Sequence, residues 1–130
     1  MSQFFSDDNS AELISPKGTI KVYKNLNVLI TPSQISNVNC LIYGWRFFNS
    51  ASVIRFVKLY DKATAPIIGT DIAKITLPVA NDVGSPFAFL LGIPFNNGLW
   101  IAVTQNASDT DTSAVPGSNQ IMAHILYANG

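Results

Sequence analysis

Residues that could do chemistry are scarce in this chain and lie far apart in the sequence. The single histidine, His124, is flanked by Ala123 and Ile125, and the single cysteine, Cys40, lies in another apolar run. Nucleophilic and acid–base catalysis both need a second titratable group beside the first. Neither residue has one nearby in sequence, and no G-x-S-x-G segment occurs. The sequence therefore predicts a protein that is not an enzyme, with His124 in packing or at an interface and Cys40 as a small buried hydrophobe.

Asp109 and Asp111 are the sharpest candidates for a metal site. Two carboxylates two residues apart offer the hard oxygens that calcium prefers, but the segment lacks the glycine and distal glutamate of an EF-hand loop. Aspartate and threonine are also common in turns, where their side chains bond the local backbone. We interpret the segment as a turn and expect no metal or other cofactor, with calcium binding as the alternative.

Composition predicts one domain that associates with other copies or partners. The chain has 130 residues, of which 48% are hydrophobic and only 12% are charged, against roughly 25% charged in an ordinary soluble domain. A surface so poor in charge favours association. The formal net charge of zero argues against binding to nucleic acid or to a membrane surface. All basic residues lie between Lys17 and Lys74, an asymmetry that could orient a head-to-tail contact.

The N-terminal sequence and the hydropathy of the chain predict a protein made and kept in the cytoplasm. The opening segment MSQFFSDDNS carries acids where a secretory signal needs positive charge. No apolar run approaches the roughly 20 residues of a membrane span.

Hydrophobic alternation predicts an all-β fold: a single antiparallel β-sandwich, jelly-roll-like, of about seven or eight strands. Residues 1–18 are expected to form an extended N-terminal arm and residues 19–130 the sandwich domain. In the first strand, Ile20, Val22, Leu26, Val28 and Ile30 are expected to face the core. The expected strands are 20–30, 38–48, 53–60, 75–79, 87–95, 99–104 and 120–127, with a bulge or bend at Gly92 and Pro94 and long loops at 61–70 and 105–119.

Two of these strands, 38–48 and 53–60, look like a hairpin joined by the loop 49–52, and both are apolar on two faces. A sandwich buries one face of each strand, so we expect another subunit to cover the second face. Val57 and Leu59 are assigned to the core. The predicted interface with a partner comprises Phe4, Phe5, Trp45, Phe56, Tyr60 and Trp100. The tryptophans would equally suit a sugar-binding platform.

Residues Arg46 to Tyr127 resemble a small β-sandwich domain of virion proteins of tailed bacteriophages. The resemblance lies in KLYDKATAP at Lys58–Pro66, GTD at Gly69–Asp71, GIPF at Gly92–Phe95, GLWIAVT at Gly98–Thr104 and a Ser/Thr/Asp segment at 107–112. The chain departs from that pattern at Trp100, where a small residue is usual, and at Ile72-Ala73-Lys74, which lacks the usual proline.

The resemblance implies a structural protein of the virion, made in the host cytoplasm. With the compact size and neutral surface, it leads us to expect a capsid decoration or cement protein that stabilises the phage head as a homotrimer. Its partners would be further copies of itself and the major capsid protein. The alternative is a tail or fibre-associated module that binds host surface glycans through Trp100 and the loops 61–70 and 105–119.

Overall fold

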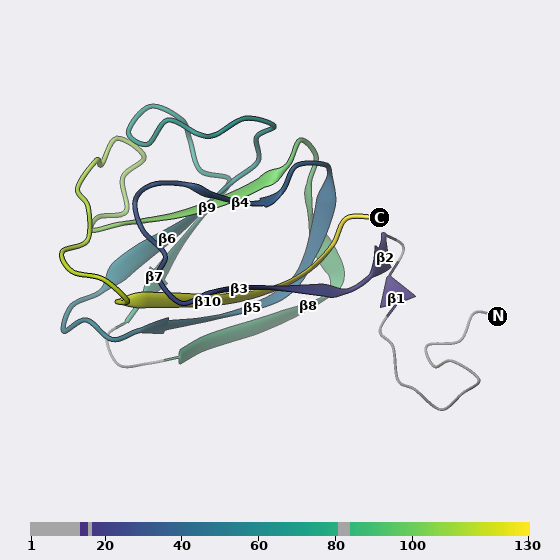
Figure 1. Cartoon of the computed structure of the whole chain (residues 1–130), viewed down its shortest axis with the longest axis horizontal. Coiled ribbons are helices and arrows are strands. Elements are labelled where there is room, and N and C mark those ends of the chain that lie inside the picture. The colour runs from purple at the N-terminus through teal and green to yellow at the C-terminus, as the bar shows by residue number, and fades with distance from the viewer. Residues whose placement is uncertain (1–13, 16, 81–83) are drawn as a thin grey trace.

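The computed structural model describes residues 14–15, 17–80 and 84–130, and its described residues form strands, turns and loops without a helix. Eight strands build two four-stranded antiparallel sheets, which form the two layers of a sandwich (Figure 1). The first sheet has the order β3-β10-β5-β8 and the second the order β4-β9-β6-β7. The strands are β3 (Lys21–Asn25), β4 (Ser33–Ser36), β5 (Cys40–Asn49), β6 (Arg55–Tyr60), β7 (Ile75–Val79), β8 (Gly84–Phe95), β9 (Leu99–Thr104) and β10 (Ile121–Ala128). Two further strands of two residues each, β1 (Ile14–Ser15) and β2 (Gly18–Thr19), pair beside the sandwich.

The strand order is that of a jelly roll, as the sequence predicted. Antiparallel pairs are nested, since β3 pairs with β10, β4 with β9, β5 with β8 and β6 with β7. This is the pattern of one long hairpin wrapped around a core. The pairs β10–β5 and β9–β6 then complete the two sheets.

The core lies between the two sheets. In β6, β9 and β10 the residues that face this core are those that the sequence alternation predicted. Leu99, Ile101 and Val103 of β9 are fully buried, as are Val57 and Leu59 of β6. In β10 the residues Ile121, Ala123 and Ile125 face the same core, with Tyr127 packed at its margin. The bend predicted in 87–95 is confirmed, because Gly92 of β8 has a φ of 81° and the β5–β8 register shifts between Ile42 and Gly44.

The predicted hairpin of 38–48 with 53–60 is wrong. β5 and β6 belong to different sheets, so residues 50–54 cross from one layer to the other. Asn49, which is fully buried, holds this corner: its amide nitrogen donates to the carbonyls of Val53 and Val79, both at 2.9 Å, and its oxygen accepts from Ala51 N at 2.8 Å. The short link between the two apolar runs suggested a hairpin because the sequence does not show that Asn49 is buried and holds a corner.

The faces predicted for two strands are also corrected. The bulge in β5 places Cys40, Ile42, Trp45 and Phe47 together in the core, although simple alternation put the first two opposite the last two. In β3 the side chain of Tyr23 packs against the core, while Val22 is 61% exposed. Tyr23 pairs with buried Ile125 of β10, so the neighbouring strand fixes which face of this edge strand is covered.

The first predicted strand, 20–30, ends at Asn25, and β4 was not predicted at all. β4 has the sequence SQIS, with one apolar residue, so it carries no alternation that could be recognised. Most of the predicted arm, including Phe4 and Phe5, lies outside the described residues, as does most of the expected turn at 81–84.

Replacement of Asn49 with alanine tests the corner. Two carbonyls and one backbone N–H would lose their partner inside the core, so we expect the free energy of unfolding to fall by about 2–4 kcal/mol. Chemical denaturation would measure it. Asn37→Ala, at an exposed turn position, should change stability by less than about 0.5 kcal/mol. Equal effects of the two substitutions would contradict the role of Asn49.

Candidate interaction surface

The two sheets differ in what covers their outer faces. The outer face of β6 and β9 carries Phe56, Lys58 and Tyr60 beside Trp100, Ala102 and Thr104. Four of these six are fully buried and the other two are half-buried, although the face points away from the core. The cover comes from the same chain, namely the loop 61–74 and the loop 105–120, hereafter the two covering loops. The expectation that a second subunit must cover this face is therefore corrected.

Lys58 is the centre of this covered face. Its side chain is fully buried, and its ammonium nitrogen donates to the carbonyl of Ser108 at 2.5 Å. Burial lowers the pKa of Lys58, while the nearby Asp111 and Asp109 act in the opposite direction. Lys58 thus ties the loop 105–120 to the sheet.

Four carboxylates in the covering loops accept backbone hydrogen bonds, namely those of Asp61, Asp71, Asp109 and Asp111. Asp61 accepts from the backbone nitrogens of Asn96 and Asn97 at 3.0 and 2.8 Å, which fixes the β8–β9 turn. Asp109 accepts from Ala73 N at 3.1 Å and so joins one covering loop to the other.

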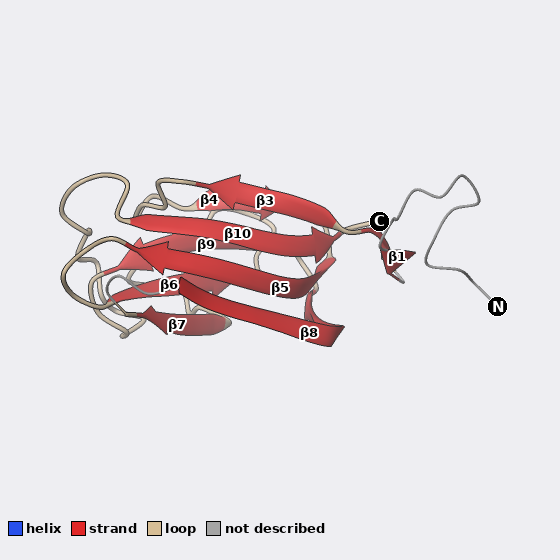
Figure 2. Ribbon diagram, turned by 90° about the horizontal axis from the view of Figure 1, so that it is seen from below, coloured by secondary structure: helices blue, strands red, loops and turns tan. Residues whose placement is uncertain are grey.

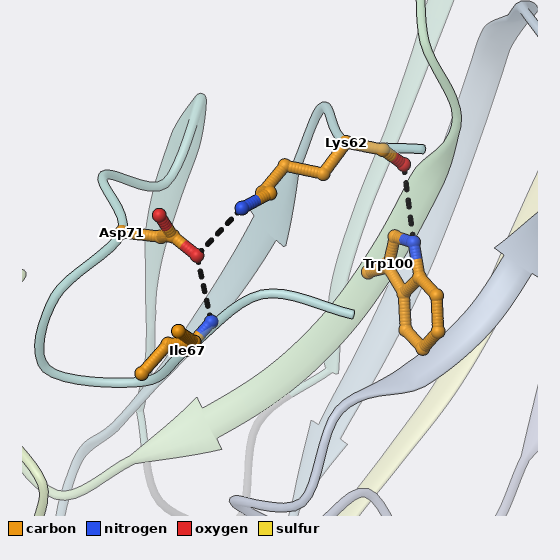
Figure 3. Close-up of polar contacts among 4 residues, drawn as sticks. All are labelled: Lys62, Ile67, Asp71 and Trp100. Atoms are coloured by element: carbon orange, nitrogen blue, oxygen red, sulfur yellow. Dashed lines mark hydrogen bonds and ion pairs between the residues drawn. The ribbon is translucent and has the colours of Figure 1, made fainter. Parts of the chain in front are cut away.

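Asp71 organises the loop 61–74. Its carboxylate binds the ammonium of Lys62 at 2.8 Å and Ile67 N at 2.7 Å (Figure 3), and these bonds lower its pKa. The carbonyl of the same Lys62 accepts the indole N–H of Trp100 at 3.1 Å (Figure 3).

Asp111 behaves as the turn interpretation predicted. Its oxygens accept from Ser113 Oγ at 2.7 Å and from the backbone nitrogens of Asn106 and Ser113, and these bonds lower its pKa. Asp109 accepts its hydrogen bond from Ala73 N in the other covering loop. Among the residues that the structure describes, no three His, Cys, Asp or Glu side chains gather in a group that could hold a metal.

No loop in the described part of the chain covers the outer face of the other sheet, hereafter the bare face. Figure 2 looks onto β3, β10, β5 and β8, and none of the loops that are drawn as described crosses them. A shallow depression of about 300 Å³ on this face is lined by Arg46 and Phe48 of β5 and by Met122 and His124 of β10. This face is the candidate interaction surface. Sequence reasoning missed it because its outward residues are a mixture of apolar and basic types with no motif.

Of the predicted interface residues, Tyr60 is fully buried in its own chain and Trp45 is 8% exposed within the core. Neither presents a surface to a partner. Phe56 and Trp100 are half-buried at the covered face. Burial raises the pKa of Tyr60 to about 12, with Asp109 and Asp71 adding to the effect. Burial likewise raises the pKa of Cys40 to about 11, which agrees with its predicted role as a buried hydrophobe.

Comparison with protein families, with curated proteins and with solved structures finds no match for the chain. In the described part of the chain, no helix has the length and hydrophobicity needed to cross a membrane.

Gly69 tests the contact between the two covering loops. It has a φ of 92°, and a Cβ there would overlap Cγ2 of Thr112 in the other loop. We expect Gly69→Ala to lower the free energy of unfolding by about 2 kcal/mol or more. Gly117→Ala is the matched control, because its φ is 83° but a Cβ there would lie 3.3 Å from a flexible side-chain atom of Gln120.

A double-mutant cycle separates backbone strain from the loop contact. Thr112→Ser removes Cγ2, so the double variant should recover at least about 0.5 kcal/mol of the loss, as measured by chemical denaturation. Strict additivity of Gly69→Ala and Thr112→Ser would show that the loops do not touch at this point.

The lowered pKa of Asp111 predicts an acid-sensitive contribution to stability. A carboxylate whose pKa is lower in the folded than in the unfolded chain stabilises the fold above the unfolded pKa, near 3.9, and loses this effect as the pH falls through the folded pKa. Between neutral pH and a pH below about 4, the free energy of unfolding should therefore fall less for Asp111→Asn than for the unsubstituted protein. Chemical denaturation at both pH values would measure the two changes. An identical acid dependence in both would contradict the assignment.

Proposed function

We propose that this chain is a non-enzymatic structural protein of a tailed-bacteriophage virion, a decoration or cement protein that stabilises the capsid as a homotrimer. The observation that carries the proposal is a long edge strand with exposed apolar side chains. In β8, Leu91 is 85% exposed and Phe87 is 58% exposed. Exposed apolar side chains on an otherwise charge-poor surface favour burial against a partner.

The edge of β8 favours contact through side chains over extension of the sheet. Pro86 and Pro94 lie within this strand, and a proline cannot donate a hydrogen bond to an added strand. The ring of Phe87 lies 6.1 Å from that of Trp45, so a partner seated here would close over the margin of the core. Both features are compatible with a protein whose copies contact one another through the side chains of β8.

The alternative, a glycan-binding tail module, has less support. Trp100, its proposed platform, is half-buried, and its indole N–H is engaged by the carbonyl of Lys62. A cement role needs no pocket for a substrate. A protein that binds only the assembled shell stabilises that shell by mass action.

Leu91→Lys tests the proposed subunit contact. A charge placed in an apolar contact should weaken self-association of the purified protein at least about tenfold, measured by sedimentation velocity over a concentration series. Ile72→Lys is the matched control, because Ile72 is 78% exposed but lies in a covering loop. Equal self-association of both variants and the unsubstituted protein would contradict a contact at β8.

The cement role itself is tested on particles. Particles that lack the protein should release their contents at a lower temperature and at low salt, and adding purified protein should restore resistance. Particles equally resistant with and without it would refute the role. Leu91→Lys should restore less resistance than Ile72→Lys.

A further inference from the structure

The neutral chain is divided into an acidic segment and a basic remainder. Residues 1–13 carry Asp7, Asp8 and Glu12 and no basic residue, a formal charge of −3. Residues 14–130 carry eight basic residues against five acidic ones, a formal charge of +3. The overall net charge of zero therefore conceals two parts of opposite sign.

Two of these basic residues, Lys24 and Arg46, form a row with the imidazole of His124 between them on the bare face of the β3-β10-β5-β8 sheet. Lys24, His124 and Arg46 are direct cross-strand neighbours on β3, β10 and β5. The two ion pairs found among the described residues involve other lysines, Lys62 and Lys74. The described side-chain carboxylates, those of Asp61, Asp71, Asp109 and Asp111, all bond to backbone in or beside the covering loops of the other sheet.

Apolar side chains flank the basic row. On one side, Phe48 and Met122 line the depression together with Arg46 and His124. On the other side, Val22 and Leu126 are paired across β3 and β10 and are 61% and 37% exposed. A ligand that combines carboxylates with an aromatic ring two residues away would match this surface.

Residues 1–13 are tethered close enough to reach it. Ile14 pairs with Thr19, immediately before β3, at the end of the sheet where Lys21 pairs with Tyr127. Thirteen residues extend up to about 45 Å, whereas the eight residues of β10 span about 27 Å. A segment on so short a tether has an effective concentration of the order of millimolar at this face, which favours it over a second copy.

We infer that the acidic segment 1–13 binds the bare face of its own chain, with carboxylates over the row Lys24–His124–Arg46 and an aromatic ring in the adjoining depression. In an extended segment Phe5 and Asp7 lie about 6.7 Å apart, which equals the spacing of successive outward rows of a sheet. Phe5 then occupies the depression at Phe48 and Met122 while Asp7 meets Arg46. The inference concerns the free protein and does not depend on a role in the virion.

Paramagnetic relaxation in the full-length protein tests this contact. A nitroxide attached at Ser6→Cys should broaden the amide signals of Arg46, Phe48, Met122 and His124, and leave those of the covering loops sharp. The native Cys40 is buried, which directs the label to position 6. Replacing Asp7 and Asp8 with asparagine, or Lys24 and Arg46 with glutamate, should abolish the broadening, and the unchanged remaining signals confirm that each variant is folded.

A mixed sample identifies the occupant. Spin-labelled chain without isotope is mixed with isotope-labelled chain without nitroxide, and we expect no broadening in the isotope-labelled chain. Broadening in the mixed sample would overturn the assignment in favour of a second copy. Absence of broadening in the single-species sample would overturn the contact altogether. Broadening that survives both charge variants would overturn its electrostatic basis.

Discussion

The burial of Lys58 under two loops of its own chain is the interaction on which the rest of this structure depends. An ammonium group taken out of water needs a hydrogen-bond acceptor, and Ser108 O supplies it. The loop 105–120 is therefore held on the sheet, and Asp109 joins it to the loop 61–74 through Ala73 N. One face of the sandwich is closed from within, which leaves the other sheet and the β8 edge as the surfaces open to partners.

Much of the fold could be predicted from local patterns, because alternation in strands such as Leu99–Thr104 is set by one buried face. The errors occur where long-range geometry overrides the local pattern. The buried Asn49 holds a corner at which the chain leaves β5 and crosses to the second sheet. A bulge in β5 moves Trp45 into the core, and SQIS becomes a strand only because β9 lies beside it. Tyr60 was assigned to a subunit face because two folded-back loops leave no periodic signal in a sequence.

The two sheets of the sandwich differ because described loops cover the outer face of only one of them. Because loops of the same chain close one outer face, the edge strand β8 is left available to neighbours. In our proposal the β8 edge joins copies of the protein on a phage capsid. The row Lys24–His124–Arg46 lies on the other exposed surface, which in our inference serves the free chain and not the contact between copies.

A cryo-EM map of the native particle is the most direct test of this account. We expect density for the protein on the capsid shell, in threefold-related copies, with β8 at the contacts between copies and the two covering loops away from those contacts. Density on the tail, or copies that meet through the covering loops, would contradict the account.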